Sequence, residues 1–139
     1  MIDATSLEHI ASYCEGMDID SIWYYFDKPN GAILKNDYIN FDERREAFLW
    51  TVKQLVEHNY IRLAEMGKPK NFLNGTVDEN IDLLRQAFPK DDEGMHGGLW
   101  FFFDDCPVGC NWYAEWNGNP IPFVGIVKLT WFQGEGAVK

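Results

Sequence analysis

The chain has 139 residues, 46% of them hydrophobic, which is enough for the core of a single domain over residues 1–139 and too many for a disordered chain. Its 22 acidic and 12 basic residues leave a formal net charge of −10 at pH 7, so nucleic acids and anionic membranes are not expected partners. The longest apolar run, residues 99–103, is too short to span a lipid bilayer.

Two helices are predicted in the first quarter of the chain. Apolar residues recur at helical spacing over residues 6–15. Their common face consists of Leu7, Ile10, Ala11 and Cys14. Asp18 or Asp20 can cap a short second helix over residues 22–26, although this aromatic run also fits a strand. A turn and an irregular connection are expected over residues 29–40.

The central part of the chain begins with the most regular helical pattern. Asp42 is predicted to cap this helix, and residues 58–59 are predicted to end it. Its apolar face consists of Phe48, Val52, Leu55 and Val56. Residues 60–64 are predicted to form a strand, and a polar loop or hairpin is expected over residues 65–74.

A further helix is predicted from a local capping motif. Thr76 and Glu79 have the spacing of a capping box, in which each side chain bonds the other's backbone N–H. Apolar residues follow at helical spacing, and Pro89 marks the end of the helix. These apolar residues are Val77, Ile81, Leu84 and Phe88.

The last third of the chain changes to strand-like patterns. Three strands separated by turns are predicted: Leu99–Phe103, Asn111–Glu115 and Phe123–Trp131, the last with a bulge at Gly125. Alternate residues of the first strand are expected to face opposite sides of the sheet. The order of elements predicts an α+β fold, with N-terminal helices packed on one face of a small C-terminal antiparallel sheet.

A cation-free stretch is the most informative functional feature. Residues 91–127 contain no lysine or arginine. Their acids are Asp91, Asp92, Glu93, Asp104, Asp105 and Glu115. Their aromatic residues are Trp100, Phe101, Phe102, Phe103, Trp112, Tyr113, Trp116 and Phe123. An acidic and aromatic surface of this kind favours a basic protein as partner.

The residues predicted to bind this partner divide into two groups. The carboxylates of Asp91, Asp92, Glu93, Asp104 and Asp105 are expected to steer a cationic surface towards the chain. The rings of Trp112 and Trp116 are expected to anchor the complex after docking. No catalytic residue, metal ligand or cofactor is predicted, so an enzymatic function is the less favoured interpretation.

An alternative interpretation is a small metal-binding or hydrolytic enzyme centred on His96, Cys106 and Cys110. A zinc site needs four ligands, and a second pair to accompany the two cysteines is missing. His96 could also act as the base for a cysteine nucleophile, but no third, orienting residue can be named. Two buried cysteines flanking a turn explain the spacing more simply. A third interpretation is a small-molecule binding module whose pocket is formed by the aromatic third.

Four tracts of the chain resemble one family in content and order. They are Ile22–Tyr25, Arg44–Trp50, Gln86–Pro89 and Trp100–Pro107. Together they resemble, over residues 5–116, the small uncharacterised bacterial proteins grouped as domain of unknown function 596. The resemblance brings no catalytic residues, because the family has no established activity. Relatives in toxin–immunity gene clusters imply an immunity protein that neutralises a basic bacterial toxin.

The expected compartment follows from the cysteines and the N-terminal segment. Three cysteines, Cys14, Cys106 and Cys110, do not form an even disulfide framework. The first residues also lack the basic and apolar segments of a signal peptide. We therefore expect a cytoplasmic protein, and nothing in the sequence indicates its oligomeric state.

Overall fold

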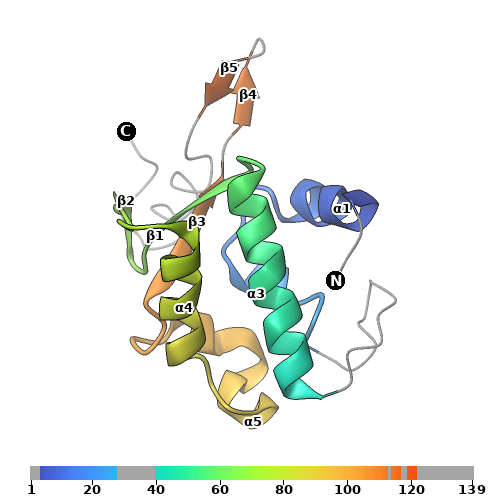
Figure 1. Cartoon of the computed structure of the whole chain (residues 1–139), viewed down its shortest axis with the longest axis vertical. Helices are drawn as coiled ribbons and strands as arrows, with labels where there is room; N and C mark the ends of the chain where they lie inside the picture. The colour runs from blue at the N-terminus through green and yellow to red at the C-terminus, as the bar shows by residue number, and fades with distance from the viewer. Residues whose placement is uncertain (1–3, 28–39, 113, 117–118, 122–139) are drawn as a thin grey trace.

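The computed structural model describes residues 4–27, 40–112, 114–116 and 119–121, and it has an α+β fold (Figure 1). The helices are α1 (Ala4–Cys14), α2 (Asp20–Trp23), α3 (Phe41–Glu57), α4 (Val77–Ala87), α5 (Asp92–Met95) and the 3₁₀ helix η1 (His96–Phe102). The strands are β1 (Ile61–Glu65), β2 (Lys68–Phe72), β3 (Val108–Trp112), β4 (Ala114–Trp116) and β5 (Asn119–Ile121). The predicted turn at 29–31 and the predicted strand Phe123–Trp131 lie outside the described residues.

A three-stranded antiparallel sheet, in the order β2-β1-β3, lies beside the helices. β1 pairs with β3 in a continuous register from Ile61 opposite Trp112 to Glu65 opposite Val108. β1 and β2 form the hairpin that the sequence left open as an alternative to a loop. β4 and β5 form a separate two-stranded ladder. Two of the three strands of the main sheet therefore come from the middle of the chain, not from its last third.

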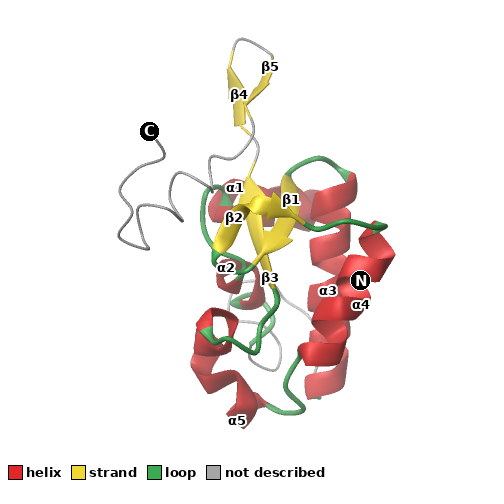
Figure 2. Cartoon of the chain, turned by 90° about the vertical axis from the view of Figure 1, so that its left-hand side faces the viewer, coloured by secondary structure: helices red, strands yellow, loops and turns green. Residues whose placement is uncertain are grey.

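The long helices α3 and α4 run side by side along the sheet (Figure 2). α4 begins with the predicted capping box, in which Thr76 Oγ1 accepts from Glu79 N and Glu79 Oε1 accepts from Thr76 N. The cap of α3 differs from the prediction, because the Asn40 side chain, not Asp42, accepts from the backbone N–H of Glu43 at 2.8 Å. Asn40 precedes Asp42 by two residues and directly precedes the first helical residue, Phe41, which is the position where an N-cap side chain can accept from the backbone of the first turn.

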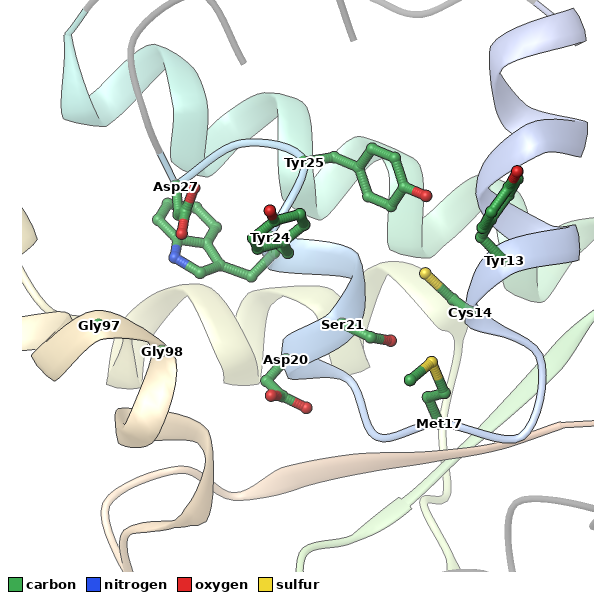
Figure 3. Close-up of a pocket in the computed structure, with 11 residues that line it drawn as sticks. Tyr13, Cys14, Met17, Asp20, Ser21, Tyr24, Tyr25, Asp27, Gly97 and Gly98 are labelled. Atoms are coloured by element: carbon green, nitrogen blue, oxygen red, sulfur yellow. The ribbon is translucent and has the colours of Figure 1, made fainter. Parts of the chain in front are cut away.

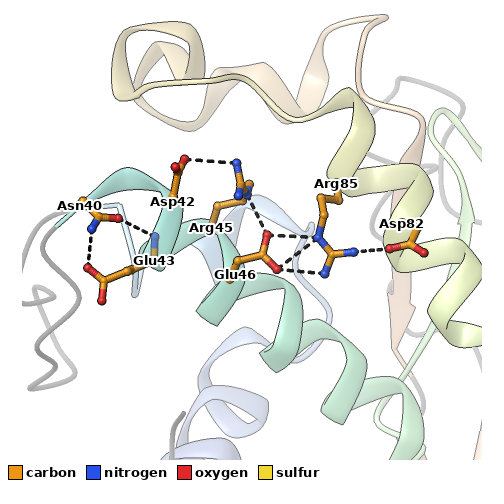
Figure 4. A network of polar contacts seen from close by, with 7 residues as sticks. All are labelled: Asn40, Asp42, Glu43, Arg45, Glu46, Asp82 and Arg85. Carbon is orange, nitrogen blue, oxygen red and sulfur yellow. Dashed lines mark hydrogen bonds and ion pairs between the residues drawn. The ribbon is translucent and has the colours of Figure 1, made fainter.

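Ion pairs connect α3 and α4 on their exposed sides (Figure 4). Arg85 of α4 donates two guanidinium hydrogen bonds to Glu46 Oε1, at 3.0 and 3.2 Å. Arg45 also donates to Glu46 at 2.9 Å, and Arg85 contacts Asp82 on its own helix. Burial alone would raise the pKa of the Glu46 carboxyl. The hydrogen bonds and charges of Arg85 and Arg45 together outweigh this effect, so the pKa is lowered. Residues 41–90 hold eight acidic and eight basic residues, and several of these opposite charges form local ion pairs.

The hydrophobic core contains a cluster of aromatic rings. The Trp23 ring of α2 lies 5.4 Å from the rings of Phe48 and Phe88, between centroids. Phe88 in turn contacts Trp100 at 5.1 Å, and Phe48 contacts Phe101 at 5.5 Å. This cluster joins α2, α3, the end of α4 and η1. Its five rings therefore have a structural role in the core.

The predicted strand Leu99–Phe103 is wrong, because most of this run lies in the 3₁₀ helix η1. α5 ends where its C-cap, His96, adopts a left-handed φ of 49°, and Gly97 and Gly98 continue with φ angles of 66° and 100° before the regular turns of η1. Burial then follows a helical pattern in which the adjacent residues Trp100 and Phe101 are both buried. The strand predicted over 111–115 is also divided, because β3 ends at Trp112 and the next strand belongs to the second ladder.

Candidate functional site

The predicted steering carboxylates come from the two ends of one compact segment, residues 91–105, which we call the acidic segment. It comprises α5, η1 and the turn that follows η1. Four of its acids are exposed and form no ion pair with the residues that the structure describes: Asp91, Glu93, Asp104 and Asp105. Asp91 is also the N-cap of α5, where its Oδ1 accepts from Gly94 N at 2.9 Å. Its carboxylate therefore also has a local structural role.

Asp92 differs from the other acids because its charge is matched by a buried arginine. Arg44 of α3, which is 2% exposed, donates to the two carboxylate oxygens of Asp92 at 2.8 and 2.5 Å. The same guanidinium donates to the backbone oxygens of Phe26 and Asp27. The Asp92 carboxylate, which stays 56% exposed, therefore neutralises a buried cation and joins α5 to α3, and its role in steering a partner stays a prediction.

Trp112 is not available as a partner anchor. It is 1% exposed, on a strand whose five residues are all buried. Its indole Nε1 donates to the backbone oxygen of Met17 at 2.8 Å, so β3 is joined to the connection between α1 and α2. The prediction for Trp112 is wrong because its large ring and its N–H are both used inside the fold. Trp116 lies in β4 opposite Asn119, and its role stays a prediction.

Exposed apolar side chains do occur in the acidic segment, but they belong to other residues. Leu99 is 60% exposed, Phe102 39% and Phe103 40%. The Phe103 ring lies 5.2 Å from the His96 ring, and Asp104 and Asp105 follow directly. The acidic segment thus combines exposed carboxylates with exposed apolar groups. A helical interpretation of residues 99–103 would have placed these three side chains outside the core.

The geometry gives little support to chemistry at His96, Cys106 and Cys110. Burial raises the pKa of the Cys106 thiol to about 11 and raises that of Cys110 well above its usual value. Such thiols stay protonated at neutral pH, whereas nucleophiles and metal ligands are thiolates. His96 is exposed on η1, and its ring lies against that of Phe103 at an interplanar angle of 54°. Within the described ranges, no group of three or more His, Cys, Asp or Glu residues could hold a metal ion.

A pocket of about 380 Å³ opens beside the acidic segment, between α1, α2 and the beginning of η1 (Figure 3). Tyr13 and Met17 lie on one side, Gly97 and Gly98 on the opposite side, and residues of α2 lie between them. Among the residues that the structure describes, its lining includes no lysine or arginine. The sequence contains no signal for this pocket, because its two sides are about 80 residues apart in the chain.

Burial changes the proton affinity of several groups in and near this pocket. The pKa of the Asp20 carboxyl, which lines it, is raised chiefly by burial. The pKa of the neighbouring Asp18 is raised to about 6, first by burial and then by the charge of Asp20. Burial also raises the pKa of Tyr25 to about 12, so this phenol stays neutral across the physiological range.

Comparisons with known proteins agree with the family that the sequence resembles. Residues 56–121 match the family described as "Protein of unknown function, DUF596", which confirms the recognition of this family. The match includes the tracts Gln86–Pro89 and Trp100–Pro107, and the two earlier tracts lie outside it. No curated protein matches the chain in sequence.

One solved structure has a similar fold. It is described as an uncharacterised protein conserved in bacteria, from Neisseria meningitidis. The alignment has a TM-score of 0.57 and 17% sequence identity, and it covers 84% of this chain and 85% of that one. At this identity the likeness concerns the fold alone. In the part of the chain that the structure describes, no helix has both the length and the apolar character needed to cross a membrane.

Proposed function

We propose that this chain is a non-catalytic acidic binding protein that acts in the bacterial cytoplasm and neutralises a basic protein partner, such as a toxin. The observation that carries the proposal is the composition of the acidic segment. It exposes carboxylates and apolar side chains together, and it contains no lysine or arginine. The family resemblance to proteins from toxin–immunity gene clusters supports the same function.

The two kinds of side chain have different roles in this proposal. The carboxylates of Glu93, Asp104 and Asp105 attract a cationic surface and increase the association rate. Leu99 and Phe103, at 60% and 40% exposure, lose contact with water after docking and slow dissociation. The proposal does not rely on Asp92 or Trp112, because the Asp92 carboxylate is paired with Arg44 and the Trp112 ring is buried.

The proposal is tested with the partner captured from the native host. Stopped-flow kinetics compare the wild-type chain with the triple variant Glu93→Lys/Asp104→Lys/Asp105→Lys at low and high salt. We expect the variant to associate about tenfold more slowly at low salt and to show a flatter salt dependence.

A matched control separates local steering from the effect of net charge. The triple variant Glu8→Lys/Glu15→Lys/Glu57→Lys changes the net charge by the same amount at exposed positions on α1, after α1 and on α3. It is expected to keep most of the association rate. Equal rates for the wild type and the Glu93, Asp104 and Asp105 variant at low salt would contradict the proposal.

A further inference from the structure

The pocket between α1, α2 and η1 has a wall of aromatic rings. His9 lies 4.5 Å from Tyr13 and 5.9 Å from Tyr25, between ring centroids, and the Tyr25 ring lies 6.3 Å from that of Tyr24. Three of these four residues, the tyrosines, line the pocket. Tyr13 and Tyr24 are 68% and 48% exposed, so their rings form its rim and can be reached from solvent.

The charged side chains that line the described part of the pocket are negative. Asp20 and Asp27 both line it, and within the described parts of the chain no cationic side chain does. The ionised form of Asp20 is disfavoured by burial, so a bound cation would relieve an existing cost. Aromatic faces attract cations through their quadrupoles, and a planar guanidinium both stacks on rings and bonds carboxylates.

We propose that this pocket is a recognition site for a guanidinium group, such as the side chain of an arginine on a basic partner. In this arrangement the guanidinium stacks against Tyr13 or Tyr24 and donates hydrogen bonds to Asp20. A volume of about 380 Å³ leaves room for the aliphatic stem as well. The identification of the arginine as part of a protein rests on the proposed function, whereas the affinity for guanidinium does not.

The position of the pocket supports its assignment as a guanidinium site on a basic partner's path. Gly97 and Gly98 belong to both the pocket lining and the acidic segment, so the pocket adjoins this segment. A partner attracted by the carboxylates of this segment would therefore meet the pocket next to the segment. The pocket would then add specificity to an encounter that the exposed charges only accelerate.

The test uses two small probes that differ in charge but not in shape. N-acetyl-arginine amide carries the guanidinium, and N-acetyl-citrulline amide replaces it with a neutral urea. The backbone amides of Ser21, Gly97 and Gly98 report pocket occupancy by NMR. We expect saturable shifts at these amides with the arginine probe and none with the citrulline probe at the same concentrations.

Two variants locate the binding. Asp20→Asn keeps the shape of the side chain and should weaken the arginine probe about tenfold, as for loss of a charge-assisted hydrogen bond. Tyr24→Leu removes an exposed ring and should also weaken it several-fold. The exposed Glu15→Gln, outside the pocket lining, should leave the affinity unchanged.

The outcomes separate this inference from the proposed function. Equal shifts with both probes, or no saturable shift with either, would overturn the guanidinium site. Neither result would alter the salt dependence predicted for the acidic segment. The converse combination is that the arginine probe binds the pocket while the Glu93, Asp104 and Asp105 reversals leave the association rate of the partner unchanged. That combination would support the guanidinium site and contradict the steering proposal.

Discussion

At the scale of single residues, pairing with a buried arginine distinguishes one carboxylate of the acidic segment from its neighbours. Asp92 is bonded to the buried Arg44, whereas its neighbour Glu93 is exposed and forms no ion pair within the described ranges. The two residues are adjacent in the sequence and look equivalent there. Their side chains differ in function because a residue 48 positions earlier faces only one of them.

Asp92→Asn is expected to destabilise the fold by about 2 kcal/mol, because it leaves the buried Arg44 charge without its anionic partner. The remaining hydrogen bonds from Arg44 to Phe26 and Asp27 and the partial exposure of Asp92 keep the cost below that of a fully buried pair. Urea unfolding measures the effect. The control Glu93→Gln should stay within about 0.5 kcal/mol of wild type, and a similar small change for Asp92→Asn would show that the ion pair is unimportant.

The ionisation of Asp18 is expected to make the free energy of unfolding depend on pH. Its pKa in the folded chain is about 6, against an ordinary value of 3.8. Between these values the folded state binds more protons than the unfolded state, so the contribution of Asp18 to the free energy of unfolding falls as the pH rises. Asp18→Asn removes this charge while retaining the backbone oxygen that accepts from Ser21.

We therefore expect Asp18→Asn to be more stable than wild type by about 1 to 2 kcal/mol near neutral pH, a figure reduced for partial solvent exposure. The advantage should disappear as the pH is lowered through about 4, where both states are protonated. Thermal unfolding across this range provides the measurement. A constant difference at all pH values would mean that titration of Asp18 is not its cause.

At the scale of elements, one hydrogen bond joins the helical and sheet parts of the molecule. The Trp112 indole on β3 reaches the Met17 backbone oxygen in the connection between α1 and α2. Cys110 of the same strand also lies near this oxygen, at 3.9 Å. β3 is at one end of the strand order, so these contacts help to cover the edge of the sheet.

Trp112→Phe should lower the free energy of unfolding by about 2 kcal/mol, because it removes part of the buried ring and leaves the Met17 oxygen without this donor. The same substitution at the partly exposed Trp50 of α3 serves as the control and should cost less than about 1 kcal/mol. Chemical denaturation compares the two variants. If Trp112→Phe instead left stability intact and weakened partner binding, the original anchor prediction would be restored.

At the scale of the whole molecule, acids that form ion pairs and acids that do not lie in different parts of the fold. On α3 and α4, several acids are bonded to arginine or lysine, among them Glu46, Asp78 and Asp82. In the acidic segment, four carboxylates have no such partner among the described residues. Attraction of a cationic protein is therefore expected to be concentrated on one side, although the net charge of −10 belongs to the whole chain.

The apolar part of this surface yields a prediction that is independent of charge. Leu99→Ser should increase the dissociation rate of the captured partner about tenfold, because it removes an exposed contact from the acidic segment. Leu83→Ser on α4 is the matched control, with 43% exposure and a position away from that segment. Both variants should unfold within about 0.5 kcal/mol of wild type. Equal dissociation rates for the two would place the interface elsewhere.

Local motifs account for most of the fold that could be predicted. The capping box at Thr76, the long amphipathic helix before residue 58 and the strand at 60–64 all depend on residues a few positions apart. The predicted strand over 99–103 failed because the run of aromatic residues fits several periodicities. In the structure it follows three residues with positive φ angles, His96, Gly97 and Gly98, and continues as a 3₁₀ helix.

Composition and short-range patterns were sufficient for the α+β class, the acidic character, most of the helices and the family resemblance, because each depends on neighbours along the chain. The pairing of Asp92 with Arg44, the burial of Trp112 and the pocket between α1 and η1 required the folded chain. These features bring together residues between 48 and 95 positions apart, and no periodicity encodes such contacts. Which acids remain open to a partner is therefore a property of long-range burial and pairing.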